Sequence, residues 1–204
     1  MEIRKIFKFN GVHIVRNCSS ERCKKSIHAH TYTVELFFEA DTLDNGQMVL
    51  DFGLMKGPIK DIIKSFDGTY SLWIKEDKDF KEMIYKNYER VITTPMSPSA
   101  ESYSIMILNL VEGIINATQF NNGEGEIKLS KVRVHETRTG YAEASREEAL
   151  GKVLLTDFDY SDEVIESWND HEFMDKTIEY CIQSARGVHI DKPFINIAPE
   201  MQIK

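Results

Sequence analysis

This 204-residue sequence has few cysteines, no long apolar run and no excess of positive charge. No run of apolar residues approaches the roughly 18 that a membrane-spanning helix needs. The N-terminal residues 1–5 lack the apolar stretch of a signal peptide. The sequence therefore predicts a cytoplasmic protein without a membrane partner. Because the net charge is −8, no bulk basic surface for nucleic acid is expected.

The three cysteines, Cys18, Cys23 and Cys181, are an odd number and cannot all form disulfides with one another. In a cytoplasmic protein, thiols more often serve as reactive groups or metal ligands. Hydrophobic residues make up 42% and charged residues 28% of the chain, which is ordinary for a folded globular protein. The length suffices for one sizeable domain with an extension.

Strand-like alternation and helical spacing follow one another in six segments, 5–15 (strand), 28–40 (strand), 54–66 (helix), 100–117 (helix), 127–136 (strand) and 140–145 (strand). This β-β-α-α-β-β order predicts an α+β fold, in which a four-stranded antiparallel sheet carries two helices on one face. Residues 1–150 are expected to form this domain. Residues 151–204 are expected to form an acidic C-terminal extension with a helix near 172–185. A charged insert, 75–90, is expected to be partly helical.

The sharpest local feature is the pair His28 and His30 in the second strand. Side chains two residues apart in a strand point to the same side, so both imidazoles can reach one ion. His13, near the end of the preceding strand, can join them if the two strands pair. Three neutral imidazoles suit Zn²⁺ and leave a fourth position open, as in catalytic zinc sites. The alternative is a pair of polar residues that simply face a cleft.

Cys23 lies in the loop before these histidines, next to Arg22 and Lys24. Nearby positive charge lowers the pKa of a thiol, so Cys23 is a candidate base or nucleophile. It can equally be an exposed loop cysteine without a role. A third interpretation joins Cys18 and Cys23 with the two strand histidines in a closed structural zinc site, although the spacing of the histidines is tighter than structural sites normally use.

Two further segments carry polar residues of interest. Glu136 ends the strand 127–136, where a carboxylate facing a cleft can pair with a guanidine-like heterocycle through two hydrogen bonds. A charged residue at a strand end can also simply be solvated. Ser99 is a plausible N-cap of the helix 100–117, and Glu101 is a candidate cap or turn residue.

Together these pieces resemble the 6-pyruvoyl-tetrahydropterin synthase / 6-carboxytetrahydropterin synthase family over about the first 145 residues. The motifs occur in family order, which chance rarely produces. They are Phe9-x-x-x-His13, Cys23 before His28-x-His30, Met48-Val49-x-Asp51-Phe52-Gly53-x-x-Lys56, Ser97-Pro98-Ser99-Ala100-Glu101 and His135-Glu136-Thr137.

The resemblance implies a T-fold, in which subunits of a homo-oligomer join their sheets into a barrel with active sites between subunits. It implies that the three histidines hold zinc, that Cys23 and Asp67 transfer protons, and that Glu136 anchors the pterin ring, with Ser99 and Glu101 also at the substrate. The implied reaction is that of a carbon–carbon lyase similar to 6-carboxytetrahydropterin synthase. Such an enzyme converts 7,8-dihydroneopterin triphosphate to 6-carboxy-5,6,7,8-tetrahydropterin, acetaldehyde and triphosphate, a step towards the queuosine base (preQ0).

This sequence departs from the family pattern at two positions. The family's Leu-Asp-His motif appears as Phe66-Asp67-Gly68, so the histidine that shares proton transfer with the aspartate is absent. Losing a general acid or base typically costs about 10²–10⁴-fold in rate unless another group substitutes. Ala29 replaces the usual glycine between the paired histidines, a small change. Two alternatives therefore stay open: 6-pyruvoyltetrahydropterin synthase-type activity, and a non-catalytic pterin- or zinc-binding homologue.

Overall fold

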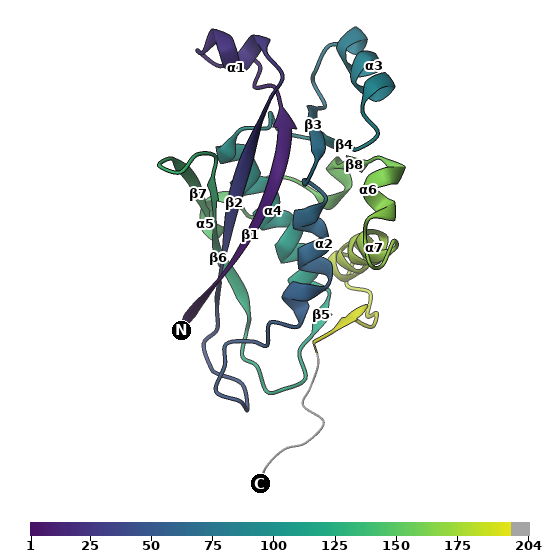
Figure 1. The fold of residues 1–204 in the computed structure, drawn as a ribbon. Coiled ribbons are helices and arrows are strands. Elements are labelled where there is room, and N and C mark those ends of the chain that lie inside the picture. Colours follow the sequence, from purple (N-terminus) through teal and green to yellow (C-terminus); the bar gives the residue numbers. More distant parts are fainter. Residues whose placement is uncertain (197–204) are drawn as a thin grey trace.

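The computed structural model describes residues 1–196 of the chain. Figure 1 shows the elements. In chain order they are β1 (Glu2–His13), α1 (Glu21–Lys25), β2 (His28–Glu39), the 3₁₀ helix η1 (Leu54–Lys56), α2 (Pro58–Lys64), β3 (Thr69–Trp73), α3 (Lys78–Asn87), β4 (Val91–Thr94), α4 (Ala100–Asn116), β5 (Thr118–Gln119), β6 (Lys128–His135), β7 (Tyr141–Ser145), α5 (Arg146–Ala149), the 3₁₀ helix η2 (Leu155–Asp157), β8 (Asp159–Tyr160), α6 (Asp162–Glu166), α7 (Phe173–Ala185) and β9 (Phe194–Ile195).

Seven of the strands form one mixed sheet in the order β7-β6-β2-β1-β3-β4-β8. The predicted antiparallel part is present, because β1, β2, β6 and β7 pair with antiparallel neighbours. On the other side of β1, however, β3 and β4 add in parallel and β8 adds in antiparallel orientation. The α+β class is confirmed, and the expectation of only four strands is wrong.

The additional strands escaped sequence analysis for a physical reason. In β3 the first four residues, Thr69 to Leu72, are all buried, and in β4 all four residues are buried. β3 and β4 are only five and four residues long, so they offer at most two repeats of the alternation by which a strand is recognised, and in β4 two apolar residues are followed by two threonines.

Helices α2 and α4 both pack against the sheet face that carries Val34, Leu36 and Phe38 of β2, as expected. Helix α4 begins where the Ser99 hydroxyl accepts a hydrogen bond from the backbone of Ser102, and nearly all of its apolar side chains are buried. The helix expected over 54–66 is divided into η1 and α2, because Pro58 has no N–H to continue a helical ladder. Within residues 1–196, no helix has both the length and the apolarity to cross a membrane.

The charged insert and the C-terminal extension are both attached to this core. The insert contains α3, whose first turn is capped by the Asp77 carboxylate. In the extension, β8 pairs with β4, β9 pairs with β5, and α7, the expected tail helix, packs against α4 (Figure 1). The extension therefore continues the sheet at β4 and packs against α4.

Candidate active site

Three histidines meet where β1 ends and β2 begins. In the antiparallel register His13 lies directly opposite His28, and Gly11 lies opposite His30. The three side chains therefore share one side of the sheet. Each offers a ring nitrogen, and these atoms all lie within 4.8 Å of one another. A group of this kind could hold a metal ion, and the strand pairing that the sequence required is present.

Backbone carbonyls orient two of the three rings. Nδ1 of His13 lies 2.5 Å from the carbonyl oxygen of Pro98, and Nδ1 of His28 lies 2.8 Å from that of Ser26. Because a carbonyl can only accept a hydrogen bond, each Nδ1 carries the proton and donates it. Nε2 is then unprotonated in both rings, as a metal ligand requires, and in His13 it also lies 3.3 Å from the Tyr32 hydroxyl.

Burial favours the neutral form of His13. The side chain is fully buried. Burial, together with the neighbouring His28 and His30, lowers the pKa of His13 from 6.5 to about 4, against the opposing effect of the Pro98 carbonyl. At neutral pH the imidazole is therefore uncharged, which is the form that binds metals. The other two histidines are half-buried, so the cluster is open on one side.

Glu136 and Tyr32 lie beside the three histidines. Oε1 of Glu136 lies 3.8 Å from Nε2 of His13 and 3.7 Å from Nε2 of His30, and it accepts a hydrogen bond of 3.3 Å from the Tyr32 hydroxyl. The preceding residue, His135, points to the other side of the sheet, where it bonds to Glu35 at 2.6 Å. Alternation beyond the end of β6 thus turns the Glu136 carboxylate towards the histidines.

Tyr32 holds its proton firmly, because burial raises the pKa of this phenol far above its usual value and the neighbouring Tyr103 and Glu136 raise it further. The hydroxyl therefore acts as a donor to Glu136. The arrangement combines a possible metal site with an acceptor carboxylate that is fixed by a neutral donor. Such a carboxylate can bind a planar heterocycle that carries N–H donors, while a substituent of the heterocycle extends to a metal ion held by the histidines.

The two residues expected to transfer protons are not hydrogen-bonded to the histidine cluster within residues 1–196. Cys23 is half-buried in α1, and its backbone carbonyl accepts from Val15. The Asp67 carboxylate accepts from the backbone and side-chain nitrogens of Asn10, at 2.7 and 3.2 Å. Asn10 alternates with Gly11 in β1 and so faces the opposite side of the sheet. Among residues 1–196, no hydrogen bond or ion pair joins Cys23 or Asp67 to the three histidines.

The start of α4 approaches the cluster through its backbone. Ser99 caps the helix, with its hydroxyl 3.3 Å from the backbone nitrogen of Ser102. Glu101 is exposed in the first turn. The contact with the site comes instead from Pro98, whose carbonyl fixes His13. The alternative zinc site built on Cys18 and Cys23 is not formed within the described residues, where the histidines alone make a metal-binding group.

Comparison with known proteins agrees with the motifs. Residues 2–147 match the family model of 6-pyruvoyl tetrahydropterin synthase. The chain belongs to this family. Membership of the 6-pyruvoyl tetrahydropterin synthase family confirms the resemblance drawn from the sequence, and with it the expectation of a lyase enzyme.

Named relatives carry a more specific description. The 6-carboxy-5,6,7,8-tetrahydropterin synthase of Helicobacter pylori strain J99 is 40% identical over 197 residues, which cover 93% of this chain and 98% of the relative. The enzyme of the same name from Aquifex aeolicus is 25% identical over 162 residues, covering 72% of this chain and 98% of the relative. The match to the Helicobacter protein therefore takes in most of residues 151–204.

Solved structures show the same fold. An uncharacterized protein from Wolinella succinogenes superposes with a TM-score of 0.58 at 21% identity, covering 71% of this chain and 97% of its own. The 6-pyruvoyl tetrahydropterin synthase of Plasmodium falciparum superposes with a TM-score of 0.50 at 18% identity, covering 78% of this chain and 98% of its own. These neighbours support the T-fold architecture of the 6-pyruvoyl tetrahydropterin synthase family.

Sequence analysis missed two residues that shape the pocket. Tyr32 follows His30 by two positions and so shares its side of β2, a spacing from which its place beside the histidines could have been predicted. Pro98 acts through its carbonyl oxygen, and the identity of a side chain gives no indication of a contact made by the backbone.

Proposed function

We propose that this protein is a zinc-dependent carbon–carbon lyase that converts 7,8-dihydroneopterin triphosphate to 6-carboxy-5,6,7,8-tetrahydropterin, acetaldehyde and triphosphate, a step towards the queuosine base (preQ0). The observation that carries the proposal is the cluster of His13, His28 and His30, whose ring nitrogens lie within 4.8 Å of one another. The name shared by the Helicobacter and Aquifex relatives supports this choice of reaction.

Zinc fits the donor set. Three neutral imidazoles are a ligand set that Zn²⁺ takes in catalytic sites. Carbonyl contacts at His13 and His28 leave an unprotonated Nε2 in each ring. When bound, the ion supplies a Lewis acid that polarises oxygen atoms of the substrate side chain.

The remaining roles are assigned to residues of the chain. Glu136 binds the N–H groups of the pterin ring, oriented by the Tyr32 hydroxyl. Cys23 and Asp67 move protons at the carbons of the substrate side chain, and Ser99 and Glu101 contribute to substrate binding. Because no hydrogen bond or ion pair joins Cys23 or Asp67 to the histidine cluster of their own protomer within residues 1–196, we propose that the active sites of a homo-oligomer lie between subunits.

We further propose that residues 1–150 form the catalytic domain, that 151–204 form its extension, and that the protein acts in the cytoplasm. The thiols of Cys18, Cys23 and Cys181 are all free, which supports a reducing compartment. Residues 197–204, the end of the proposed extension, lie outside the described residues.

The experiment that tests the function is an assay of this single reaction. The purified protein is incubated with 7,8-dihydroneopterin triphosphate, acetaldehyde is measured, and the metal content of the same sample is determined. We expect acetaldehyde and one zinc per chain, and both should be lost in the variant His28→Ala. Triphosphate release without acetaldehyde would instead identify 6-pyruvoyltetrahydropterin synthase-type activity.

A second candidate function is a pterin- or zinc-binding protein without catalysis. The observation that favours it is Gly68, which stands where the family has a proton-transferring histidine and has a left-handed backbone with φ of +66°. Zinc and pterin binding without any turnover would support this candidate and contradict the lyase.

A further inference from the structure

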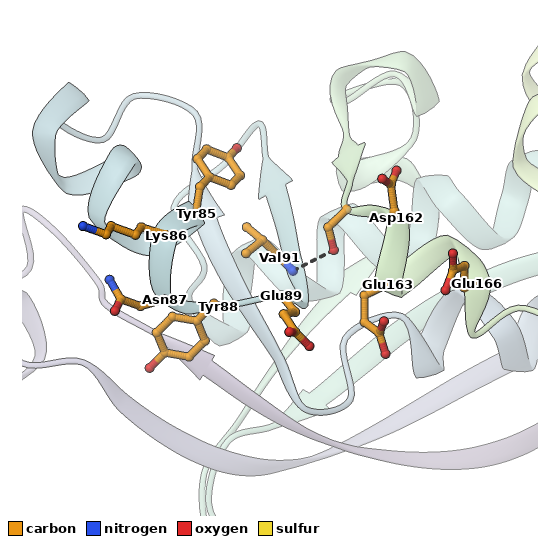
Figure 2. Close-up of a pocket in the computed structure, with 10 residues that line it drawn as sticks. Tyr85, Lys86, Asn87, Tyr88, Glu89, Val91, Asp162, Glu163 and Glu166 are labelled. Carbon is orange, nitrogen blue, oxygen red and sulfur yellow. Dashed lines mark hydrogen bonds between the residues drawn. The ribbon is translucent and has the colours of Figure 1, made fainter.

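The segment Ser161–Asn169 of the extension lies along the domain beside β4. The backbone nitrogen of Ser161 donates to the carbonyl of Val91 at 3.0 Å, and its hydroxyl accepts from the Val91 nitrogen at 3.1 Å. Figure 2 shows this second bond, with Glu89 of the domain on one side and Asp162 and Glu163 of α6 on the other. The two parts of the chain are therefore joined at the residue that follows Arg90.

Two buried contacts fix the end of α2 to this segment. The indole nitrogen of Trp168 donates to the Ser65 hydroxyl at 2.7 Å. Asn169 donates twice to the Asp61 carboxylate, at 3.1 Å from its backbone and 2.8 Å from its side chain. Asp61 and Ser65 are buried and lie one helical turn apart. The Ser65 hydroxyl also donates to the Asp61 carbonyl at 2.9 Å, so loss of the Trp168 contact removes the donor to its oxygen and not its own hydrogen bond. Loss of the Asn169 contacts leaves the buried Asp61 carboxylate without these two donors.

Arg90 extends the connection to Asp67. Its Nε donates to the Asp67 carbonyl at 3.3 Å, while Nη1 donates to the Glu163 carbonyl at 3.0 Å and Nη2 to the Ser167 hydroxyl at 3.4 Å. One guanidinium thus joins the backbone of the Asp67–Gly68 turn to helix α6 of the extension. A lysine at this position has no planar fork that reaches three acceptors.

The opposite side of the turn is held by β1. The Gly68 nitrogen donates to the Asn10 carbonyl at 2.7 Å, and the Asn10 nitrogen donates to the Asp67 carboxylate at 2.7 Å. Glycine at φ of +66° leaves the backbone free to adopt other conformations. A turn with this freedom keeps one geometry only if contacts on both sides impose it.

We propose that the extension is a positioning element of the active site, which sets the Asp67–Gly68 turn through Arg90 and Trp168. The inference rests on the proposed catalytic role of Asp67. A proton-transfer group must be held within a fraction of an ångström of its productive position, and a displacement of about 1 Å can cost up to about 10²-fold in rate. Arg90 and Trp168 are positioning residues, because they act on the carboxylate through the backbone.

Two variants and one matched control test the proposal on the zinc-loaded full chain. Arg90→Lys keeps the charge and removes the fork, and Trp168→Phe removes the indole N–H but keeps a ring. The chain has two tryptophans. The other, Trp73, has a buried indole nitrogen with no hydrogen-bond partner among residues 1–196, so Trp73→Phe deletes an N–H that makes no hydrogen bond there.

The first readout is hydrogen exchange in peptides that contain Asn10 and Gly68, which does not depend on activity. We expect exchange about tenfold faster in both variants, and unchanged exchange in Trp73→Phe and around the histidine cluster. The second readout is turnover of 7,8-dihydroneopterin triphosphate. We expect kcat to fall about tenfold, with KM and zinc content unchanged, and no further fall when either variant is combined with Asp67→Asn.

The outcomes separate the positioning from the proposed function. Unchanged exchange at Asn10 and Gly68 in both variants would overturn the positioning, whatever the activity. Suppose that exchange is faster but that Arg90→Lys or Trp168→Phe lowers kcat just as much in the Asp67→Asn background. The extension would then not act on catalysis through Asp67. If Asp67→Asn alone leaves kcat unchanged, the catalytic role of Asp67 is wrong, while the exchange data still decide whether the extension fixes the turn.

Discussion

Replacing Tyr32 by phenylalanine removes one oxygen atom from the centre of the pocket. The Tyr32 ring is fully buried and stacks on Phe9 with 4.8 Å between ring centroids, so the ring of the variant keeps its packing. What is lost is the hydrogen bond of 3.3 Å to Oε1 of Glu136, together with the contacts of 3.3 Å between the hydroxyl and the two ring nitrogens of His13. The expected effect is therefore on the orientation of the carboxylate and not on the core.

The size of the effect follows from the geometry. A hydrogen bond to a charged group contributes about 1.5–3 kcal/mol. The bond from Tyr32 is long, and the Glu136 side chain is 34% exposed, so water can partly replace the lost donor. We expect the lower end, about 1.4 kcal/mol, which corresponds to a tenfold change in an equilibrium constant. The KM for 7,8-dihydroneopterin triphosphate should rise about tenfold, while kcat changes less than about threefold and zinc stays bound.

Tyr103→Phe is the matched control. Tyr103 is equally buried in the same aromatic cluster, with 5.1 Å between its ring centroid and that of Tyr32, but its hydroxyl donates to Ser71 at 2.7 Å. This variant should lower the unfolding free energy by about 1–3 kcal/mol, because Ser71 is left unsatisfied, without a change in KM. Steady-state kinetics, zinc analysis and urea unfolding decide the outcome. An unchanged KM in Tyr32→Phe would refute the orienting role, and loss of zinc would show that the hydroxyl serves the metal site instead.

Three further predictions concern the site. Burial lowers the pKa of His13 from 6.5 to about 4, so between these pH values the unfolded metal-free chain binds more protons than the folded one. The stability of the metal-free protein, measured by urea unfolding, should therefore fall by up to about 3 kcal/mol as the pH drops from 6.5 to about 4. His13→Asn should flatten this dependence. Gly68→His should raise turnover but lower stability by about 1–2 kcal/mol, because φ is +66° even though nothing lies within 4 Å of an added Cβ. Gly68→Ala measures the backbone strain alone. If turnover rises in neither variant, another group carries the proton. Replacing Cys18 and Cys23 together by serine should leave one zinc per chain, and loss of the metal would instead establish thiolate ligation.

The antiparallel half of the sheet could be predicted from the sequence because apolar and polar residues alternate along its strands. Val34, Leu36 and Phe38 of β2 point into the core and the intervening residues point out of it, a pattern with a clear period of two. The same period placed His28 and His30 together and, with strand pairing, His13. Strands β3 and β4 could not be found in this way, because they are only five and four residues long and give too few repeats of the period.

The contacts that complete the pocket were beyond sequence reasoning for other reasons. The Pro98 carbonyl that orients His13 comes from a loop 85 residues away along the chain, and only the packing of α4 brings it there. The attachment of the extension likewise depends on single long-range contacts, such as that between Trp168 and Ser65. Neither has a periodic pattern or a characteristic spacing in the sequence.

The direct pairing of His13 with His28 has a consequence for how the protein assembles its sheet. If β1 slipped by one residue along β2, every β1 side chain would move to the other face of the sheet. Phe9 would then leave the core, and His13 would leave the histidine cluster. Correct folding and metal capture are thus two outcomes of one strand alignment. If the cluster binds zinc as proposed, a zinc titration of refolded protein counts the chains in which β1 and β2 have paired in the correct register.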